Sequence, residues 1–407
     1  MTVQDVRASS RQQRQERNSW LAKVDFDRAP FTIAWEVTRA CAFSCVHCRA
    51  DAQHRRAPGE LTTEEGYALI DRFTEFGSPI LVFTGGDPMM RPDLFDLIAY
   101  ADSAGLRCSL TPTATALPTV KRLRRAQEAG VRRIALSLDS PTPEIHDEFR
   151  RVRGSWERTM TILHNAKEIG LSTQINTTVT THNVDALPEM VQFVREVGAV
   201  QWSVFFLVPM GRGQQLSMIS PQQHEEVLGW LHDLAQQGDF DIKATAAPMY
   251  RRISAQRGGG HGGAGAGFAF HDGLNRPVQG VNDGRGFLFV SHLGDITPSG
   301  FLPITVGNVR VDDVVDVYRN HELFRALRDP EQLTGKCGVC EFREACGGQR
   351  GRAYAVTGDP LASDPACAYV PPAWTGGAGC SSSEKSPRPP HSGPGLSTKL
   401  SGATLST

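Results

Sequence analysis

The chain has 407 residues, with 43 Lys and Arg against 44 Asp and Glu and a formal net charge of −1. This balance provides no general attraction for a polyanion, so we expect no nucleic-acid partner. The first 30 residues contain no apolar run, and no stretch reaches the roughly 18 consecutive apolar residues that a spanning helix needs. We therefore expect a cytoplasmic protein with no secretory signal and no membrane partner.

Seven of the nine cysteines fall into two compact groups. Three lie within the eight residues from Cys41 to Cys48, four more lie from Cys337 to Cys367, and Cys108 alone lies between the groups. A reducing cytoplasm disfavours structural disulfides. Two groups of thiolates in such a compartment indicate two metal sites.

Short apolar runs alternate with amphipathic stretches between Phe31 and Pro209. The predicted strands are Thr32–Val37, Pro79–Thr84, Leu106–Thr111, Arg133–Leu138, Thr173–Val179 and Gln201–Val208. The predicted helices are Thr63–Phe76, Asp93–Ala104, Thr119–Ala129, Trp156–Ile169 and Leu187–Val197. These helices are followed by glycines suited to a left-handed cap, at Gly77, Gly105, Gly130, Gly170 and Gly198.

Six strands separated by helices predict repeated βα units, and therefore an α/β fold with a parallel sheet. A full eight-unit barrel needs about 250 residues, whereas these units span roughly 180. We therefore predict an incomplete (β/α)6 barrel of the TIM type, followed by a small C-terminal domain around the second cysteine group.

The βα repeat fades after Pro209. Residues 221–236 predict a helix, whereas Gly258–Gly267 contains seven glycines in ten residues and cannot form regular structure. Phe287–Val290 and Asp295–Thr297 predict a hairpin, which a helix over Val311–Leu327 follows.

The predicted organisation has five parts. They are a flexible polar arm (1–28), the partial barrel (29–210), a connecting segment with the glycine-rich loop (211–290), the C-terminal domain (291–372) and a disordered tail (373–407). The tail is rich in Gly, Ser and Pro, so we expect Cys380 within it to be a free thiol.

The first cysteine group, Cys41, Cys45 and Cys48, has the spacing C-x3-C-x2-C and follows the first predicted strand. Ligand sites of parallel α/β sheets gather at the carboxyl ends of strands. Three thiolates on one loop can hold three irons of a [4Fe–4S] cube and leave the fourth open to an external ligand. The spacing by itself is equally compatible with a zinc site or with reduced surface cysteines.

The run Gly85-Gly86-Asp87-Pro88 directly follows the second predicted strand. Paired glycines let a backbone approach a ligand closely, and their carbonyls together with the Asp87 carboxylate could bind an ammonium group. An ordinary strand-to-helix turn also favours Gly and Asp. Two such motifs at successive strand ends favour a ligand site.

The cysteine loop, with His47 before its last cysteine, and the Gly-Gly-acid-Pro run together resemble the radical SAM superfamily, over roughly residues 30–372. The resemblance implies that Cys41, Cys45 and Cys48 hold a catalytic [4Fe–4S] cluster whose open iron binds S-adenosylmethionine (SAM). It also implies that an electron, from a donor such as flavodoxin or ferredoxin, cleaves SAM to methionine and a 5′-deoxyadenosyl radical. That radical would abstract hydrogen from a substrate.

The same resemblance implies cofactor contacts for seven residues. They are His47 near the adenine, Gly85, Gly86 and Asp87 at the methionine ammonium, Ser137 near the cofactor, Arg150 at the methionine carboxylate and Asn176 at the ribose. Outside that context the last three would be a capping serine, a surface arginine and a polar strand residue. Glutamate is commoner at the position of Asp87, and aspartate shortens the reach of the carboxylate.

The second cysteine group supplies four thiolates, from Cys337, Cys340, Cys346 and Cys367. Four cysteines suit either a zinc ribbon or a closed [4Fe–4S] cluster. Beside the first motif, the arrangement resembles the auxiliary-cluster domain called SPASM, or its shorter twitch form, which implies a second [4Fe–4S] cluster. Ser299 and Gly300 occupy the hairpin region where the full domain often has a cysteine, and Arg350 stands where another is expected.

The segments Cys45–Ala50, Lys336–Arg343 and Arg352–Asp359 resemble the heme-synthesis branch of this superfamily. That branch implies oxidative decarboxylation of tetrapyrrole propionates to vinyl groups. Two sets of residues are then candidates for substrate contacts, either propionate-binding arginines or iron-facing histidines: Arg49, Arg55 and Arg56, and His261, His271 and His292. Basic loops and lone loop histidines are also common on ordinary surfaces.

Two alternatives stay open. A radical SAM peptide maturase shares the two-cluster plan, although about 20 residues before the barrel are too few for a leader-binding domain. An iron–sulfur carrier or a zinc-binding interaction protein would explain the cysteines, but not Gly85–Pro88 or Arg150.

Overall fold

The computed structural model describes residues 23–258 and 280–376. The described residues up to Trp374 form one compact unit. Most of the predicted arm, most of the glycine-rich loop with His261 and His271, and the tail with Cys380 lie outside the described residues. Val24 and Phe26, within the range predicted as the arm, are buried. The core therefore begins before residue 29, and the predicted domain boundaries stay a prediction.

The strands of the described residues form one ten-stranded sheet in the order β10-β9-β8-β1-β2-β3-β4-β5-β6-β7. Neighbours from β8 through β1 to β7 pair in parallel, and β8–β9 and β9–β10 are antiparallel. The strands are β1 (Thr32–Glu36), β2 (Ile80–Thr84), β3 (Arg107–Leu110), β4 (Arg133–Ser137), β5 (Ser172–Val179), β6 (Gln201–Phe206), β7 (Asp241–Thr245), β8 (Phe287–Val290), β9 (Asp295–Thr297) and β10 (Gly307–Asn308).

The six strands predicted for the barrel are confirmed as β1 to β6, and the predicted hairpin is confirmed as β8–β9. The parallel part of the sheet is larger than predicted. It continues into β7 at one end, and β8 pairs in parallel with β1 at the other. A hairpin is a local pattern, whereas the pairing of β8 with β1 joins distant segments and has no local signal.

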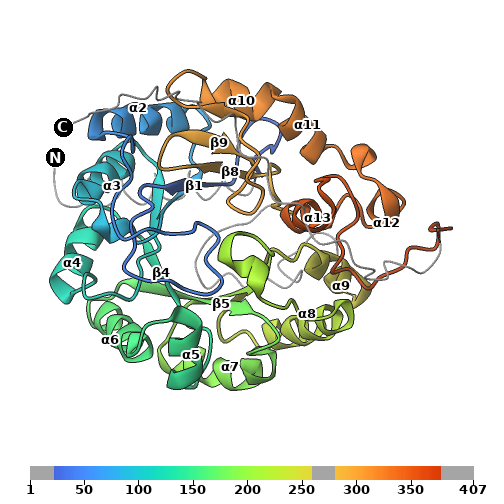
Figure 1. Ribbon diagram of the computed structural model, residues 1–407, viewed down its shortest axis with the longest axis horizontal. Coiled ribbons are helices and arrows are strands. Elements are labelled where there is room, and N and C mark those ends of the chain that lie inside the picture. The colour runs from blue at the N-terminus through green and yellow to red at the C-terminus, as the bar shows by residue number, and fades with distance from the viewer. Residues whose placement is uncertain (1–22, 259–279, 377–407) are drawn as a thin grey trace, which may run out of the picture. The chain divides into compact units, whose positions relative to one another are not determined.

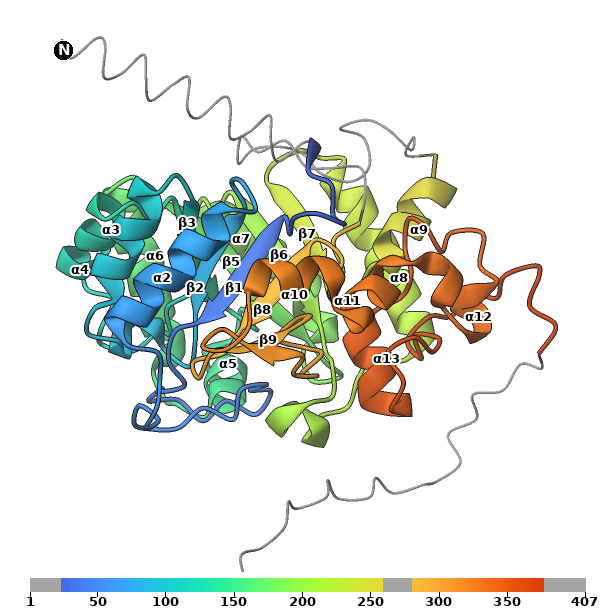
Figure 2. The ribbon, with the colours of Figure 1, turned by 90° about the horizontal axis from the view of Figure 1, so that it is seen from above.

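Helices surround the sheet (Figure 1, Figure 2). They are α2 (Thr63–Thr74), α3 (Leu94–Ser103), α4 (Val120–Glu128), α5 (Pro143–Arg150), α6 (Ser155–Glu168), α7 (Leu187–Glu196), α8 (Pro221–Ala235), α9 (Met249–Gln256), α10 (Val314–Asn320), α11 (Glu322–Arg328), α12 (Gly335–Gly338) and α13 (Arg350–Thr357). No helix of the described residues is both long and apolar enough to cross a membrane.

The ends of these helices follow local rules. A capping box formed by Thr62 and Glu65 begins α2, and the five glycines predicted as left-handed caps all have positive φ. The single helix predicted over residues 311–327 is two helices, α10 and α11. His321 between them is extended, and its ring accepts a hydrogen bond from the backbone N–H of Leu323, which caps α11.

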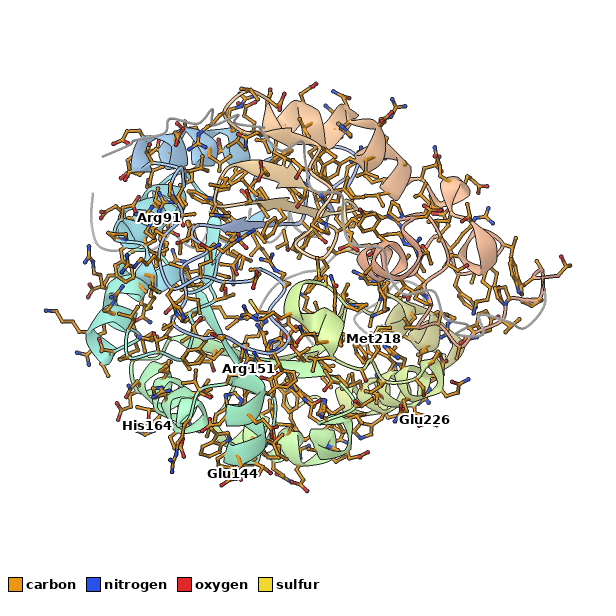
Figure 3. All side chains as sticks on the ribbon, in the orientation of Figure 1. Arg91, Glu144, Arg151, His164, Met218 and Glu226 are labelled. Carbon is orange, nitrogen blue, oxygen red and sulfur yellow. The ribbon has the colours of Figure 1, made fainter. Side chains whose placement is uncertain are left out.

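Alternation along the strands separates a packed outer face from a polar inner face. In β5, Ile175 is buried in the hydrophobic core beneath the helices, whereas its neighbours Gln174 and Asn176 line an internal cavity. Successive side chains of a strand point to opposite faces, so one strand serves both. Polar residues on the helices, such as His164 on α6 and Glu226 on α8, lie on the outer surface (Figure 3).

Candidate functional site

A cavity of about 550 Å³ lies inside the curved sheet. Residues from the inner faces of β1 to β8 line it, together with the cysteine loop after β1, the segment after β7 and the loop after β9. Its volume falls within the range of about 300–1,000 Å³ that is typical of ligand and cofactor sites. In parallel α/β proteins, ligand sites lie at the carboxyl ends of the strands, and this cavity reaches that end of the sheet.

The cysteine loop leaves the carboxyl end of β1 and brings Cys41, Cys45 and Cys48 to the cavity wall. Arg212, in a short 3₁₀ helix (Gly211–Gln215), secures the loop. Its backbone N–H donates to the Cys48 carbonyl at 3.0 Å, and its Nε donates to the Cys45 carbonyl at 2.9 Å. Burial raises the pKa of the Cys41 thiol to about 11 and also raises that of Cys45. Three thiols held on one partly buried loop fit a cluster that supplies its own positive charge.

The glycine turn after β2 packs directly on the cysteine loop. A Cβ on Gly85 would lie 2.4 Å from the Thr38 carbonyl oxygen, and one on Gly86 would lie 2.5 Å from the Ala40 carbonyl oxygen. Both glycines also line the cavity. The structure therefore explains them first by the close approach of two backbones, and a ligand contact for them stays a prediction.

Asp87 lies beneath this turn and is fully buried. Its carboxylate accepts hydrogen bonds from the backbone N–H of Met89 at 3.1 Å and from the Thr115 hydroxyl at 3.0 Å. Burial raises the pKa of this carboxyl. Asp87 is not among the described residues that line the cavity, so the structure favours a supporting role over direct contact with an ammonium group.

His47, within the cysteine loop, also lines the cavity. Its ring stacks on Phe149 with centroids 4.5 Å apart, and its Nδ1 is buried with no hydrogen-bond partner among the described residues. Burial and the charge of Arg150 lower the pKa of this imidazole to about 3, so it is neutral at neutral pH. A neutral ring with an unpaired polar atom at the cavity wall is suited to a polar ligand such as an adenine.

Arg150, at the end of α5, lies between the cysteine loop and β4. Its Nε donates to Asp139 Oδ2 at 2.7 Å, and its Nη1 lies 3.9 Å from Cys45 Sγ. Asp139 is buried; burial opposes its ionisation, but the charge of Arg150 holds the pKa of this carboxyl below its usual value. The ion pair fixes a guanidinium at the cavity wall, where its remaining donors are available to a carboxylate.

Ser137 and Asn176 are register partners on β4 and β5, and both line the cavity. The Oδ1 atom of Asn176 accepts a hydrogen bond from Gln174 Nε2 at 2.7 Å, which orients its amide. The structure thus brings the three cysteines, His47, both glycines, Ser137, Arg150 and Asn176 around one cavity, and leaves Asp87 beneath it.

The residues predicted to contact the substrate differ in whether they line the cavity. Arg49 lines the cavity, whereas Arg55 is exposed and Arg56 donates to Glu60 outside it. His292 is buried, with its Nδ1 3.0 Å from Glu36 Oε1, and it is not among the cavity-lining residues. Arg49 therefore stays a candidate for contact with the substrate. His292 does not line the cavity, so it is not placed to face the iron of a substrate bound there.

The second cysteine group forms a separate site. Its four side chains, Cys337, Cys340, Cys346 and Cys367, line a small cavity. The backbone N–H of Gly348 donates to Cys346 Sγ at 3.4 Å, and Arg350 Nη2 lies 3.7 Å from Cys337 Sγ. Among the described residues, no three His, Cys, Asp or Glu side chains converge on the position of a single metal ion. Hydrogen bonds to sulfur are typical of iron–sulfur sites.

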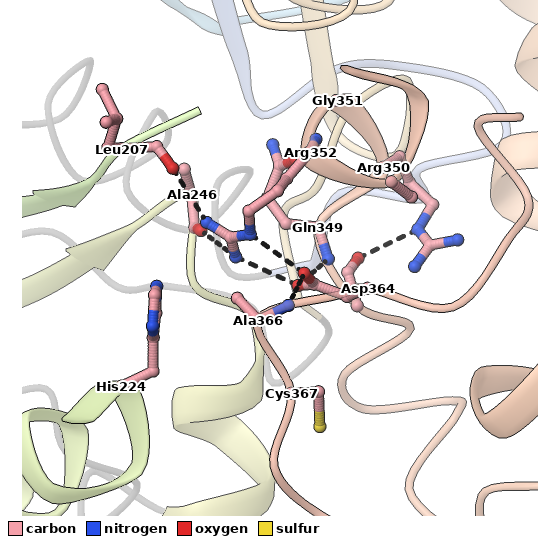
Figure 4. Close-up of polar contacts among 12 residues, drawn as sticks. Leu207, His224, Ala246, Gln349, Arg350, Gly351, Arg352, Asp364, Ala366 and Cys367 are labelled. Atoms are coloured by element: carbon pink, nitrogen blue, oxygen red, sulfur yellow. Dashed lines mark hydrogen bonds and ion pairs between the residues drawn. The ribbon is translucent and has the colours of Figure 1, made fainter. Parts of the chain in front are cut away.

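A buried ion pair joins this second site to the barrel (Figure 4). Arg352 on α13 contacts Asp364 through two hydrogen bonds of 2.9 and 3.0 Å, and both side chains are fully buried. Arg352 also donates to the carbonyls of Leu207, after β6, and Ala246, after β7. Asp364 lies three residues before Cys367, so this pair connects a cysteine-bearing loop to two strand ends.

Sequence reasoning missed several supporting residues. Asp139, two residues after the end of β4, had the local signal of a polar residue near a strand end. Arg212 had none, because the carbonyls to which it donates lie far away in the chain. Glu36 had none as a partner of Arg49, because only the path of the cysteine loop brings the two side chains together. Such contacts exist only once the sheet has curved and closed on the cysteine loop.

Comparison with known proteins agrees with this site. The sequence signature of the radical SAM superfamily matches residues 35–194. AdoMet-dependent heme synthase of Oleidesulfovibrio alaskensis is 44% identical over 341 residues, which cover 83% of this chain and 87% of that protein. Mycofactocin maturase MftC of Mycobacterium tuberculosis is 30% identical over 353 residues, covering 83% of each chain.

Among solved structures, Streptococcus suis SuiB bound to S-adenosylmethionine has a TM-score of 0.66 at 16% sequence identity, over 84% of this chain and 78% of that one. This likeness shows a shared fold. The signature match lies on the cysteine loop, the glycine turn and the strands that carry them. The chain therefore belongs to the radical SAM superfamily and is an enzyme of its heme synthase branch, a family that uses a [4Fe–4S] cluster and SAM.

Proposed function

We propose that this enzyme decarboxylates propionate side chains of an iron-coproporphyrin to vinyl groups. The charge of the cavity lining carries the proposal. Six cationic residues line it, namely Arg49, Arg107, Arg133, Arg150, Lys243 and Arg251. Asp283 is the one acidic residue among the described lining residues. Burial raises the pKa of its carboxyl, which favours the neutral form. Cavity-lining side chains that are mostly cationic suit a substrate that carries several carboxylates, although Arg49 and Arg150 also pair with the buried carboxylates of Glu36 and Asp139.

Each group of residues at the site would have its own role. Cys41, Cys45 and Cys48 would hold the cluster, and Arg150 and His47 would orient SAM beside it. Bound there, the cluster and SAM supply a 5′-deoxyadenosyl radical that abstracts hydrogen. The enclosing strands exclude water from a reactive species of this kind. Asp139 and Arg212 hold the arginine and the cysteine loop in place.

The proposed reaction removes one hydrogen atom, one carbon dioxide and one electron from each propionate. Loss of one hydrogen atom from the β-carbon leaves a carbon radical, and cleavage of the bond to the carboxylate then releases carbon dioxide and one electron and forms the vinyl double bond. That electron needs an acceptor. We propose that the second cysteine group holds a closed [4Fe–4S] cluster, which would supply one. An external donor such as flavodoxin or ferredoxin would deliver the electron that cleaves SAM.

The test uses anaerobically purified full-length protein with SAM, dithionite and iron-coproporphyrin III. We expect 5′-deoxyadenosine together with a porphyrin that has lost one carbon dioxide and two hydrogen atoms for each converted side chain, detected by mass spectrometry. SAM cleavage with an unchanged porphyrin would contradict the proposal and favour another substrate of the same radical chemistry. A peptide substrate would then be tested first, since mycofactocin maturase is also a relative.

A further inference from the structure

Arg49 occupies a distinctive place in the cavity wall. It directly follows Cys48, the last cysteine of the loop, and its guanidinium carbon lies 4.5 Å from the ring centroid of Phe289 on β8. Both residues line the cavity. Arg49 thus bridges the cysteine loop and the wall that the β8–β9 hairpin provides.

A buried carboxylate orients this arginine. Glu36, at the end of β1, is fully buried and accepts hydrogen bonds from Arg49 Nη2 at 3.3 Å and from Arg39 Nε at 3.2 Å. Burial opposes its ionisation, but His292, Arg49 and Arg39 together lower the pKa of its carboxyl to about 2. Glu36 thus contacts two guanidinium groups, and of these two the one of Arg49 lines the cavity.

Most of the hydrogen-bonding capacity of Arg49 is unused within the described residues, where its side chain makes one hydrogen bond, to Glu36. A guanidinium has five N–H groups, and its geometry matches a carboxylate. Gly300 provides the space beside it, because a Cβ at that position would lie 2.9 Å from the guanidinium carbon. The wall therefore leaves a fixed cation with free donors.

The position of Arg49 distinguishes it from Arg150. Arg150 contacts Asp139 and Cys45 on the β4 side of the cysteine loop, whereas Arg49 contacts Glu36, Phe289 and the Gly300 segment. Carboxylates in this cavity could come from the methionine part of SAM or from the substrate. The contacts of Arg49 with the hairpin wall place it on the side away from Arg150, which favours the substrate.

We propose that Arg49 binds a propionate carboxylate of the substrate, with Glu36 and Phe289 as positioning residues and Gly300 as the space that admits the guanidinium. This inference rests on the proposed tetrapyrrole substrate. It names the side chain that would recognise one of the substrate's carboxylates and thereby select which propionate faces the radical.

The test compares R49M with R39M, whose arginine binds the same Glu36 but does not line the cavity. Iron-coproporphyrin III is titrated into reconstituted protein and followed by its visible absorbance. We expect the dissociation constant to rise roughly tenfold to a hundredfold in R49M, the range for one charge-assisted carboxylate contact, and to stay within about twofold of wild type in R39M. SAM affinity and iron content should match wild type in both variants.

Two further measurements sharpen the outcome. The tetramethyl ester of iron-coproporphyrin has no carboxylates, so wild type and R49M should bind it equally. G300A keeps Arg49 but displaces its guanidinium, and should weaken binding of the free acid only. Unchanged porphyrin affinity in R49M and G300A, or a loss of SAM affinity alone in R49M, would overturn this inference. Failure of wild type to bind the porphyrin would refute the proposed function itself.

Discussion

At the residue scale, Arg150 carries its charge into a buried position beside the cysteine loop. It is held there by Asp139, which leaves part of its guanidinium at the cavity wall. We predict that R150M weakens SAM binding by about 1.5–3 kcal/mol, the value of a charge-assisted hydrogen bond. Isothermal titration of anaerobic protein with SAM measures the change.

Arg151 supplies the matched control, because it is adjacent in sequence and exposed, and does not line the cavity (Figure 3). R151M should bind SAM as wild type does. Equal SAM affinity in R150M and wild type, with similar melting temperatures, would remove Arg150 from the cofactor site.

The two cysteine groups can be separated by substitution, since they line different cavities. We predict that replacing Cys41, Cys45 and Cys48 together with alanine abolishes formation of 5′-deoxyadenosine, because no thiolate remains to hold the catalytic cluster. The metal of the C-terminal group should be retained, as metal analysis would show. Persistent 5′-deoxyadenosine formation would mean that the catalytic cluster lies elsewhere.

At the scale of elements, the ion pair of Arg352 and Asp364 joins α13 to the ends of β6 and β7. Removing one partner leaves the other as an uncompensated buried charge. We predict that R352M lowers the free energy of unfolding by about 3–5 kcal/mol. Denaturant unfolding, followed by circular dichroism under anaerobic conditions, measures this loss.

An exposed ion pair provides the comparison. Arg132 and Asp102 are in contact at 2.8 Å, but their side chains are 46% and 26% exposed. R132M should therefore change stability by less than about 1 kcal/mol. A similar small effect for R352M would show that the pair does not stabilise the junction between α13 and the barrel.

At the scale of the whole molecule, the two proposed clusters predict an iron content. Two [4Fe–4S] clusters correspond to about eight iron atoms per reconstituted chain. Iron and zinc analysis of protein purified without oxygen tests this value directly. About four irons together with one zinc would assign zinc to the C-terminal group and leave the electron released by decarboxylation without an internal acceptor.

The sequence alone determined the features that local rules govern. The strands β1 to β6, the β8–β9 hairpin and the glycine caps follow from short-range periodicity and turn chemistry, and the structure confirms them. The cysteine loop and the glycine turn were found together because both follow successive strands of a parallel sheet. The two motifs lie close together in space because successive strands of the chain are neighbours in the sheet.

Only the tertiary structure decided which side chains share the cavity. It places Asp87 beneath the glycine turn and pairs β8 with β1. It also places Arg49, but neither Arg55 nor Arg56, at the cavity wall. Each of these outcomes depends on the curvature of the sheet and on contacts between residues distant in the chain. Ion pairs such as that of Arg49 with Glu36 have no sequence signature, because their energy arises only when folding brings the two charges together in a buried place.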